Sequence, residues 1–284
     1  MGLGARLRGF VELTRPVNSI VAGVLTFIGS FVAVKLTADP ALLLPVVAAV
    51  VATVLATGAG NAINDYFDRD IDRINNPERA IPRGAVTPRG ALWFSVALFL
   101  SAVVLALALL PLLAIAIAVV NLLALVTYTE LFKGLPGVGN ALVAYLGGST
   151  FLFGGAAVGN VEPTVVLFLL AALSTLAREI IKDVEDVSGD REEGLNTLPI
   201  AIGERQSLLL AVGLLVVAAL ASPVPYLTGV FGVAYLGVVV PADLVMLYAG
   251  YEGLSDPAAG QSRLKYGMFL AAAAFVVGRA STLV

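Results

Sequence analysis

The sequence predicts an all-α protein made of membrane-spanning helices. Residues from the Ala, Val, Ile, Leu, Met, Phe, Trp, Tyr and Cys set make up 59% of the 284 residues, and charged residues make up 13%. A soluble domain has about 45–50% apolar residues with glycine included, and about 25% charged residues. Apolar runs of about 20 residues recur along the chain, which is the length that crosses a bilayer as a helix. This composition excludes a soluble globular domain, and it excludes a disordered chain as well.

We count nine apolar runs and predict a polytopic membrane protein with nine transmembrane helices. Prolines, among them Pro40, Pro111 and Pro163, mark several junctions between the runs. The predicted helices cover residues 17–37, 41–62, 91–110, 112–128, 138–158, 163–184, 206–226, 228–250 and 265–283. The whole chain, 1–284, is expected to form one transmembrane domain.

The basic residues predict how the helices are oriented. In a nine-helix arrangement, 15 of the 17 Lys and Arg residues fall on one side of the membrane, and only Lys35 and Arg279 fall near the other. Basic loops face the cytoplasm, so this side and the N-terminus are expected to be cytoplasmic in a multi-pass cell-membrane protein. Residues 61–90 and 178–206 together hold 22 of the 37 charged residues. The cytoplasmic loops 63–90 and 185–205 are therefore expected to cap a functional site.

Two segments carry aspartates at identical spacing. Asp65, Asp68 and Asp72 follow the second predicted helix, and Asp183, Asp186 and Asp190 follow the sixth, exactly 118 residues later. Both copies emerge on the same face because four helices separate them. The spacing predicts an internal parallel repeat with a site at the interface of its two halves.

The geometry of these motifs predicts a metal site. At 100° per residue, Asn64, Asp68 and Asp72 differ by steps of 40°, so their side chains share a helix face. Carboxylates packed in this way repel each other unless a cation neutralises them. The chain has no His and no Cys, so only oxygen ligands are available, and these select hard cations such as Mg²⁺. We expect metal ions to be held between the motifs and to grip a diphosphate, with these candidate ligands: Asn61, Asn64, Asp68, Asp72, Asp186 and Asp190. The candidate catalytic residues are Asp65, Asp68, Asp183 and Asp186.

Basic and aromatic residues complete the candidate site. Arg79 and Arg83 follow the first motif, and either can bind a diphosphate bidentately, although each is equally compatible with a role in setting orientation. Lys133 lies in the loop after the fourth helix and is a candidate phosphate ligand. Tyr128 precedes it and can stabilise a cation at the reacting carbon. Asp243, beside Pro241, is expected to bond to backbone groups that the proline frees, and it is left outside the site.

The sequence resembles the UbiA superfamily of intramembrane prenyltransferases. Asn64-Asp65-x-x-Asp68-x-x-x-Asp72 and Asp183-x-x-Asp186-x-x-x-Asp190 resemble its two aspartate-rich motifs. The stretch from Tyr128 to Lys133 resembles the loop between them, and the stretch from Arg15 to Asn18 resembles the entrance to the first helix. The resemblance implies nine helices around a central cavity that opens toward lipid, two Mg²⁺ ions and a prenyl diphosphate donor. Gly134 departs from the pattern, because many members carry a second basic residue there.

Within the family, the chain is most similar to archaeal members of the ether-lipid branch. The stretches Leu13–Ser19, Arg178–Asp186 and Asn140–Gly154 carry this similarity. It implies transfer of a geranylgeranyl group to the hydroxyl of geranylgeranylglyceryl phosphate, whose own phosphate would meet Arg15 or Lys182. An aromatic acceptor, as in quinone biosynthesis, stays open as an alternative, and a secondary transporter is a more distant one. Membrane lipids are the expected surroundings, and the net charge of −3 does not indicate a nucleic-acid partner.

Overall fold

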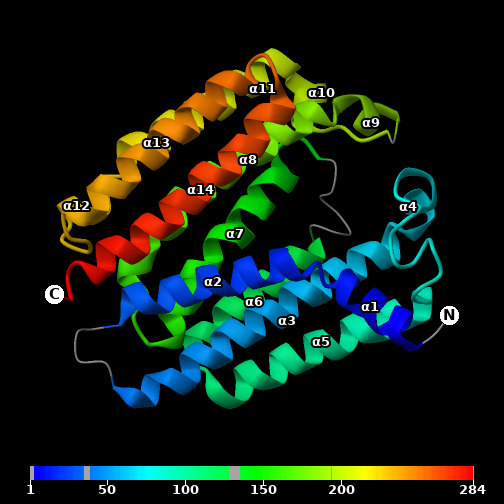
Figure 1. Ribbon diagram of the computed structural model, residues 1–284, viewed down its shortest axis with the longest axis horizontal. Helices are drawn as coiled ribbons and strands as arrows, with labels where there is room; N and C mark the ends of the chain where they lie inside the picture. Colours follow the sequence, from blue (N-terminus) through cyan, green and yellow to red (C-terminus); the bar gives the residue numbers. More distant parts are fainter. Residues whose placement is uncertain (1–2, 35–38, 128–134, 193, 284) are drawn as a thin grey trace.

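The computed structural model describes residues 3–34, 39–127, 135–192 and 194–283, and every regular element in these ranges is a helix. The elements are drawn in Figure 1. Their bounds in chain order are α1 Leu3–Leu13, α2 Pro16–Ala33, η1 Pro40–Leu42, α3 Leu43–Phe67, α4 Arg69–Asn75, α5 Pro88–Leu109, α6 Leu112–Thr127, α7 Val138–Ala157, α8 Glu162–Glu185, α9 Val187–Glu192, α10 Leu198–Ile202, α11 Glu204–Ala221, α12 Val224–Leu227, α13 Ala234–Gly253 and α14 Pro257–Ala280.

Within the described ranges, six helical stretches are long and apolar enough to cross a membrane. They are α2, η1 with α3, α5, α8, α11 with α12, and α13. Helices α6, α7 and α14 coincide with the remaining predicted runs, but α6 is shorter and the other two do not meet the same criteria. The all-helical prediction is confirmed, and six spans are supported by length and composition.

The largest difference in boundaries is at α14, which begins at Pro257 rather than at the predicted residue 265. The Asp256 side chain accepts a hydrogen bond from the Ala259 amide at 3.0 Å and so caps the helix. Proline at the first helical position also favours this start. Arg263 and Lys265 resemble loop residues by hydropathy, yet both lie inside the helix.

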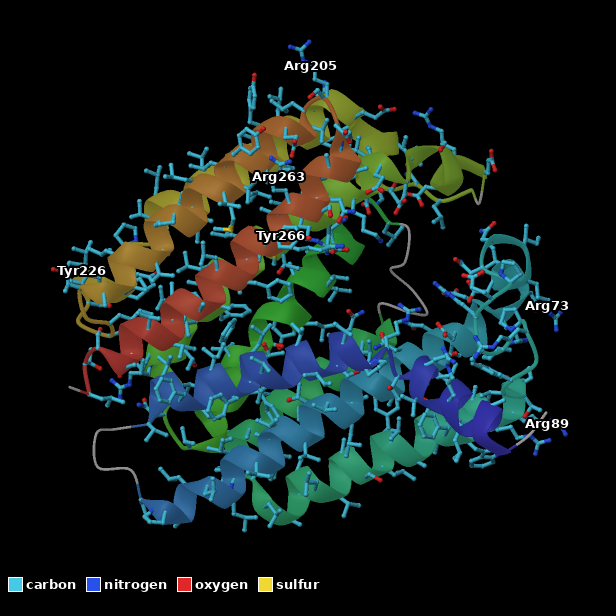
Figure 2. All side chains as sticks on the ribbon, in the orientation of Figure 1. Arg73, Arg89, Arg205, Tyr226, Arg263 and Tyr266 are labelled. Atoms are coloured by element: carbon cyan, nitrogen blue, oxygen red, sulfur yellow. The ribbon has the colours of Figure 1, made fainter. Side chains whose placement is uncertain are left out.

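The helices form two groups that meet at α7 (Figure 1). Helices α2, α3, α5 and α6 lie on one side of α7, whereas α8, α11, α13 and α14 lie on the other. The short helices α1, α4, α9 and α10 lie at one end of the molecule, which we call the polar end, and α12 lies at the opposite end. Figure 2 places Arg73, Arg89 and Arg205 at the polar end and Tyr226 at the opposite one.

Helices α2 and α7 cross in backbone contact. A Cβ atom on Gly154 would lie 2.0 Å from the Thr26 carbonyl oxygen, and one on Gly29 would lie 2.3 Å from the Phe151 carbonyl oxygen. The Ser30 hydroxyl donates to the Gly154 carbonyl oxygen across the same crossing, at 2.9 Å. Small residues commonly allow this kind of close approach between membrane helices. The crossing joins the first helix of one group to the helix that separates the two groups.

Candidate active site

A cavity of about 1000 Å³ lies among the helices. Its walls are mainly apolar side chains of α2, α3, α5, α6, α7, α8, α13 and α14. Asn18, Asn61 and Asn64 line it where α2 begins and α3 approaches its end, which is toward the polar end. The buried rings of Phe151, Tyr235 and Phe275 also line it and belong to one hydrophobic cluster. The cavity therefore combines polar groups toward the polar end with an apolar interior.

The two aspartate motifs have the same backbone conformation. Asp68 interrupts the α3–α4 helix at φ −80° and ψ 2°, and Asp186 interrupts the α8–α9 helix at φ −89° and ψ 0°. The Asp72 amide donates to the Asp68 carbonyl oxygen at 2.8 Å, and the Asp190 amide donates to that of Asp186 at 3.0 Å. The helical turn thus continues through each interruption. This brings the aspartates of each motif onto neighbouring turns, as the spacing predicts.

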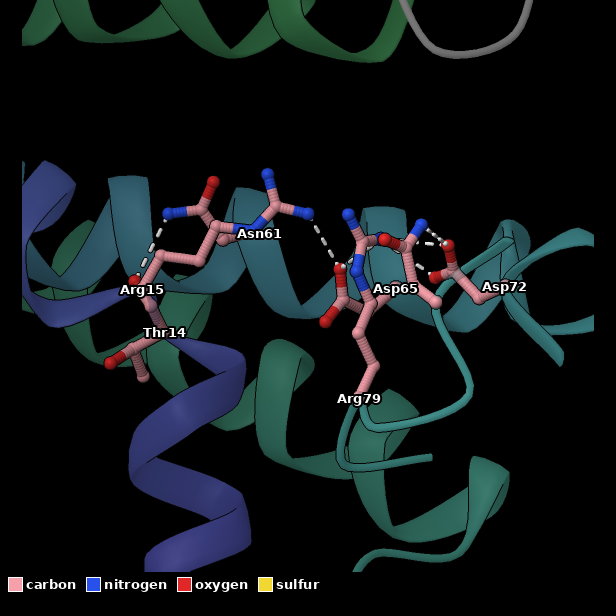
Figure 3. Close-up of polar contacts among 7 residues, drawn as sticks. Thr14, Arg15, Asn61, Asp65, Asp72 and Arg79 are labelled. Atoms are coloured by element: carbon pink, nitrogen blue, oxygen red, sulfur yellow. Dashed lines mark hydrogen bonds and ion pairs between the residues drawn. The ribbon is translucent and has the colours of Figure 1, made fainter. Parts of the chain in front are cut away.

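Asp65 is held by arginines (Figure 3). The Arg15 guanidinium donates to its carboxylate at 2.7 Å, and Arg79 lies 3.5 Å from the same oxygen. Arg15 occupies the sharp turn between α1 and α2 with φ 45°, a left-handed conformation that is uncommon for a residue with a side chain. Asn61 fixes this turn, because its amide nitrogen donates to the Thr14 carbonyl oxygen at 3.0 Å. The α1–α2 turn is therefore bonded to α3 immediately beside the motif.

Asp72 is buried and forms an ion pair with Arg79 in which one guanidinium nitrogen contacts both carboxylate oxygens. The two carboxylate oxygens accept from the Arg79 Nη1 at 2.9 and 2.7 Å, and Asn76 donates to Asp72 at 3.2 Å. Arg79 is a candidate phosphate ligand by sequence, and in the structure its guanidinium lies on carboxylates of the first motif. The neighbouring Arg83 pairs with Glu12 of α1 instead.

We expect Arg79→Met to destabilise the protein by about 3 kcal/mol, the lower end of the range for breaking a buried ion pair, because Arg79 is one-third exposed. The substitution leaves the Asp72 carboxylate buried, and Asn76 is then its remaining side-chain donor among the described residues. Thermal unfolding in detergent measures the effect, and Asp72→Asn in the same background should recover part of it. Arg73→Met is the control, because Arg73 pairs with Asp70 in an exposed contact. An Arg79→Met protein as stable as the parent would contradict this account.

The second motif is held mainly by neutral donors. The Asn140 amide of α7 donates to Asp183 at 2.8 Å, and the Thr197 hydroxyl donates to Asp190 at 3.0 Å. Lys182 lies 3.6 Å from Asp186, with both side chains about half exposed. Burial raises the pKa of the Asp190 carboxyl, the Thr197 hydrogen bond lowers it, and the nearby Asp186 charge raises it further. A bound cation would oppose this rise by favouring the ionised form.

Some residues outside the motifs also have similar positions in the two halves of the chain. Arg79 and Thr197 are 118 residues apart, and each side chain donates to the third aspartate of its own motif. Asn18 and Asn140 are each the third residue of their helices, α2 and α7. Asn18 lines the cavity and Asn140 binds Asp183. Asn140 lies 122 residues after Asn18 rather than 118, so the offset of the motifs does not relate these two residues, and sequence reasoning missed Asn140.

Among the described residues, no group of three or more acidic side chains is close enough to hold a metal ion by itself. Mg²⁺ is usually held by one or two carboxylates together with water and substrate phosphates, so a compact cage is not required. The donor types present, the amide oxygen of Asn64 and the carboxylates of Asp68, Asp186 and Asp190, fit such a hard cation. These residues are compatible with a metal shared between protein and diphosphate.

Two candidate residues, Tyr128 and Lys133, lie outside the described residues. The structure adds Arg178 and Glu179 of α8, which line the cavity. It also adds Asp243, whose carboxylate lies 2.6 Å from the Ser222 hydroxyl at the cavity wall. We expected Asp243 to bond to backbone groups freed by Pro241, but in the structure it accepts a hydrogen bond from the Ser222 side chain at the end of α11.

A family profile described as the UbiA prenyltransferase family matches residues 22–273. The chain belongs to the UbiA prenyltransferase family. It is a membrane prenyltransferase, and the transporter alternative is set aside. UbiA relatives named digeranylgeranylglyceryl phosphate synthase are 66% identical in Natronomonas pharaonis, 61% in Halobacterium salinarum and 43% in Methanopyrus kandleri. These matches cover 96%, 97% and 95% of this chain, and each covers 98% of the relative.

Solved structures agree with the UbiA assignment. A structure described as one of digeranylgeranylglyceryl phosphate synthase in membranes has a TM-score of 0.83 and 37% sequence identity to this chain. The match covers 97% of this chain and 99% of that structure's chain. A UbiA homologue from Archaeoglobus fulgidus, bound to GPP and Mg²⁺, has a TM-score of 0.70 at 16% identity, covering 93% and 99%. The second likeness establishes the fold alone.

Proposed function

We propose that the protein transfers a geranylgeranyl group from its diphosphate to the hydroxyl of geranylgeranylglyceryl phosphate. The observation that carries this proposal is the 66% identity, over nearly both full chains, to a relative named digeranylgeranylglyceryl phosphate synthase. The cavity supports it, because polar side chains line it toward the polar end of the molecule and mainly apolar side chains line the rest. This arrangement suits a donor and an acceptor that each carry a charged head and a long hydrocarbon chain. The reaction releases diphosphate and forms an ether bond.

The architecture that we propose for this activity has nine spans and two related halves. Helices α6, α7 and α14 would complete the six apolar spans, with α7 and α14 crossing the bilayer packed against neighbouring helices. The matched backbones at Asp68 and Asp186 support a parallel repeat with the site between its halves. The whole chain forms one domain, with loops 63–90 and 185–205 over the site. The polar end and the N-terminus face the cytoplasm, because the basic residues gather there.

At the polar end, we assign the diphosphate to the space between the two motifs. Two Mg²⁺ ions would be held by the candidate ligands Asn61, Asn64, Asp68, Asp72, Asp186 and Asp190. When bound, the metal neutralises the charge that develops on the leaving diphosphate. Tyr128, Lys133 and Arg79 remain candidate contacts for the reacting end of the donor, and Asn18 lines the cavity beside it.

The chain's own residues position the reactants and accept a proton. The C1–O bond of the allylic donor breaks with its electron pair going to the diphosphate, and the acceptor oxygen bonds to C1. Apolar walls keep water away from the cationic carbon. Asp183 is the better candidate for the base, because it accepts from the neutral Asn140 amide. Asp65 instead forms ion pairs with two arginines.

Removal of divalent metal is expected to abolish transfer. Oxygen-only ligands bind Mg²⁺ or Mn²⁺, and the leaving diphosphate needs this charge compensation. The assay follows labelled geranylgeranyl diphosphate and geranylgeranylglyceryl phosphate in membranes containing the protein, before and after EDTA treatment and after Mg²⁺ is restored. Full activity in EDTA would contradict the metal assignment. Prenylation of 4-hydroxybenzoate without prenylation of the glyceryl phosphate would favour the aromatic-acceptor alternative.

A further inference from the structure

A second group of polar side chains lies on the α8–α14 wall of the cavity. Arg178 of α8 and Lys265 of α14 both line it. The Arg178 Nη1 donates to Glu179 at 2.7 Å, and its Nη2 donates to Gln261 at 3.1 Å. The Arg178 Nε is buried and has no hydrogen-bond partner among the described residues. A cationic donor in this wall is therefore left without a partner.

This group lies deeper in the bundle than the second aspartate motif. Arg178 precedes Asp183 by five residues of one helix, which is about 7.5 Å along the axis. Lys265 follows Gln261 by four residues on α14, so the two side chains share a face. The group is therefore separated from the carboxylates to which we assign the donor diphosphate.

An apolar stripe continues from this group along α14. Met268, Phe269, Ala272 and Phe275 follow Lys265 at helical spacing, and all four line the cavity. A charged group followed by an apolar stripe on one wall matches a ligand with an anionic head and a long hydrocarbon chain. The acceptor in the proposed function has this composition.

The charges in this group favour an anion. Arg178 and Glu179 offset each other, whereas Lys265 has no ion pair within the described part of the chain. Arg263, two residues from Lys265, is different: it pairs with Glu252 at 3.0 Å, lies over the Tyr248 ring, and is not a cavity residue. Asp243 of α13 also lines the cavity, but its carboxylate accepts a hydrogen bond from Ser222 at the α11 end. The positive charge on the α8–α14 wall therefore comes from Lys265.

The two basic residues that the sequence predicts for the acceptor phosphate lie beside aspartates of the motifs. Arg15 binds Asp65, and Lys182 lies near Asp186. Neither of them lines the cavity. A phosphate on the acceptor thus needs a different partner.

We propose that Lys265 and Arg178 bind the phosphate of the acceptor, with its chain lying along the apolar stripe of α14. This inference rests on the proposed function and deepens it, because it assigns the residues that would make the enzyme prefer a phosphorylated acceptor. Because the donor diphosphate is assigned to the space between the two aspartate motifs, the two phosphate sites should be separable by mutation.

Lys265→Gln tests the proposal in the full-length protein with two acceptors, geranylgeranylglyceryl phosphate and geranylgeranylglycerol. The KM for the phosphorylated acceptor should rise about 10- to 100-fold, as expected for loss of one charge-assisted hydrogen bond. The donor KM and the kcat/KM for the unphosphorylated acceptor should stay the same. Arg263→Gln is the matched control, because it removes a charge from the same helix outside the cavity.

Arg178→Gln together with Glu179→Gln provides a second variant that leaves no unpaired charge in the wall, and it should reduce the preference for phosphate in the same direction. An unchanged acceptor KM in Lys265→Gln, an equal loss on both acceptors, or a raised donor KM would each overturn the inference. If the parent protein transfers nothing to either glyceryl acceptor, the proposed function fails instead. Thermal stabilisation by geranylgeranylglyceryl phosphate then tests the site directly, and equal stabilisation of the parent and Lys265→Gln would overturn it.

Discussion

Replacing Asp68 or Asp186 with alanine should lower kcat by at least about a hundredfold. Each substitution removes a carboxylate from the interruption between two helices, next to the space to which we assign the diphosphate. A metal that stabilises a leaving group contributes several kcal/mol to the transition state, and each 1.36 kcal/mol corresponds to a factor of ten in rate. The loss should therefore appear in the chemical step, measured by single-turnover transfer at saturating donor.

Asp70→Ala is the matched control for these two variants. Asp70 belongs to the same segment but is two-thirds exposed, and it pairs with Arg73 at 2.9 Å. Its removal should change the rate little, because exposed ion pairs contribute at most about 1 kcal/mol. Near-normal turnover in a folded Asp68→Ala or Asp186→Ala protein would show that the motifs do not hold the metal.

Gly154→Ala should destabilise the protein by about 3 kcal/mol or more, the upper end of the range for overpacking a tight interface. The added methyl group would lie 2.0 Å from the Thr26 carbonyl oxygen, and a backbone atom cannot move away as a side chain can. Helices α2 and α7 would have to separate, which would also break the bond from Ser30 to the Gly154 carbonyl. Unfolding temperature in detergent and the yield of folded protein measure the effect.

Gly213→Ala is the same chemical change as Gly154→Ala, but we expect it not to destabilise the protein. A Cβ at Gly213 of α11 would meet nothing within 4 Å, and alanine is the better helix former. This variant should be neutral or more stable by roughly 0.5–1 kcal/mol. If both variants unfold at the temperature of the parent, the backbone contact between α2 and α7 is looser than described.

Much of this structure was predictable from sequence because its signals are periodic. Apolar length locates the helices to within a few residues, and the 118-residue offset locates both motifs on helices with the same interruption. The start of α14 was predicted too late, because Arg263 has the hydropathy of a loop residue although it lies inside the helix.

The partners of individual site residues were not predictable in the same way. Arg79 was expected at a phosphate and lies on Asp72, a contact that depends on how the chain folds back after α4. The bond from Asn140 to Asp183 joins α7 to α8 across 43 residues, and no local spacing encodes it. The cavity role of Arg178 likewise depends on α14, whose Gln261 lies 83 residues away.

The cavity walls determine how substrates are supplied. Val17, Leu107, Val119 and Phe269 line the cavity and are also about half exposed or more, so the interior is continuous with the apolar exterior. In a bilayer, both long-chain substrates would enter sideways from the acyl region, and the two-chain product would diffuse back into it without crossing water. The concentration that governs turnover is then the mole fraction of each substrate among the lipids. Diluting the membrane with inert lipid should slow the enzyme, whereas adding buffer should not.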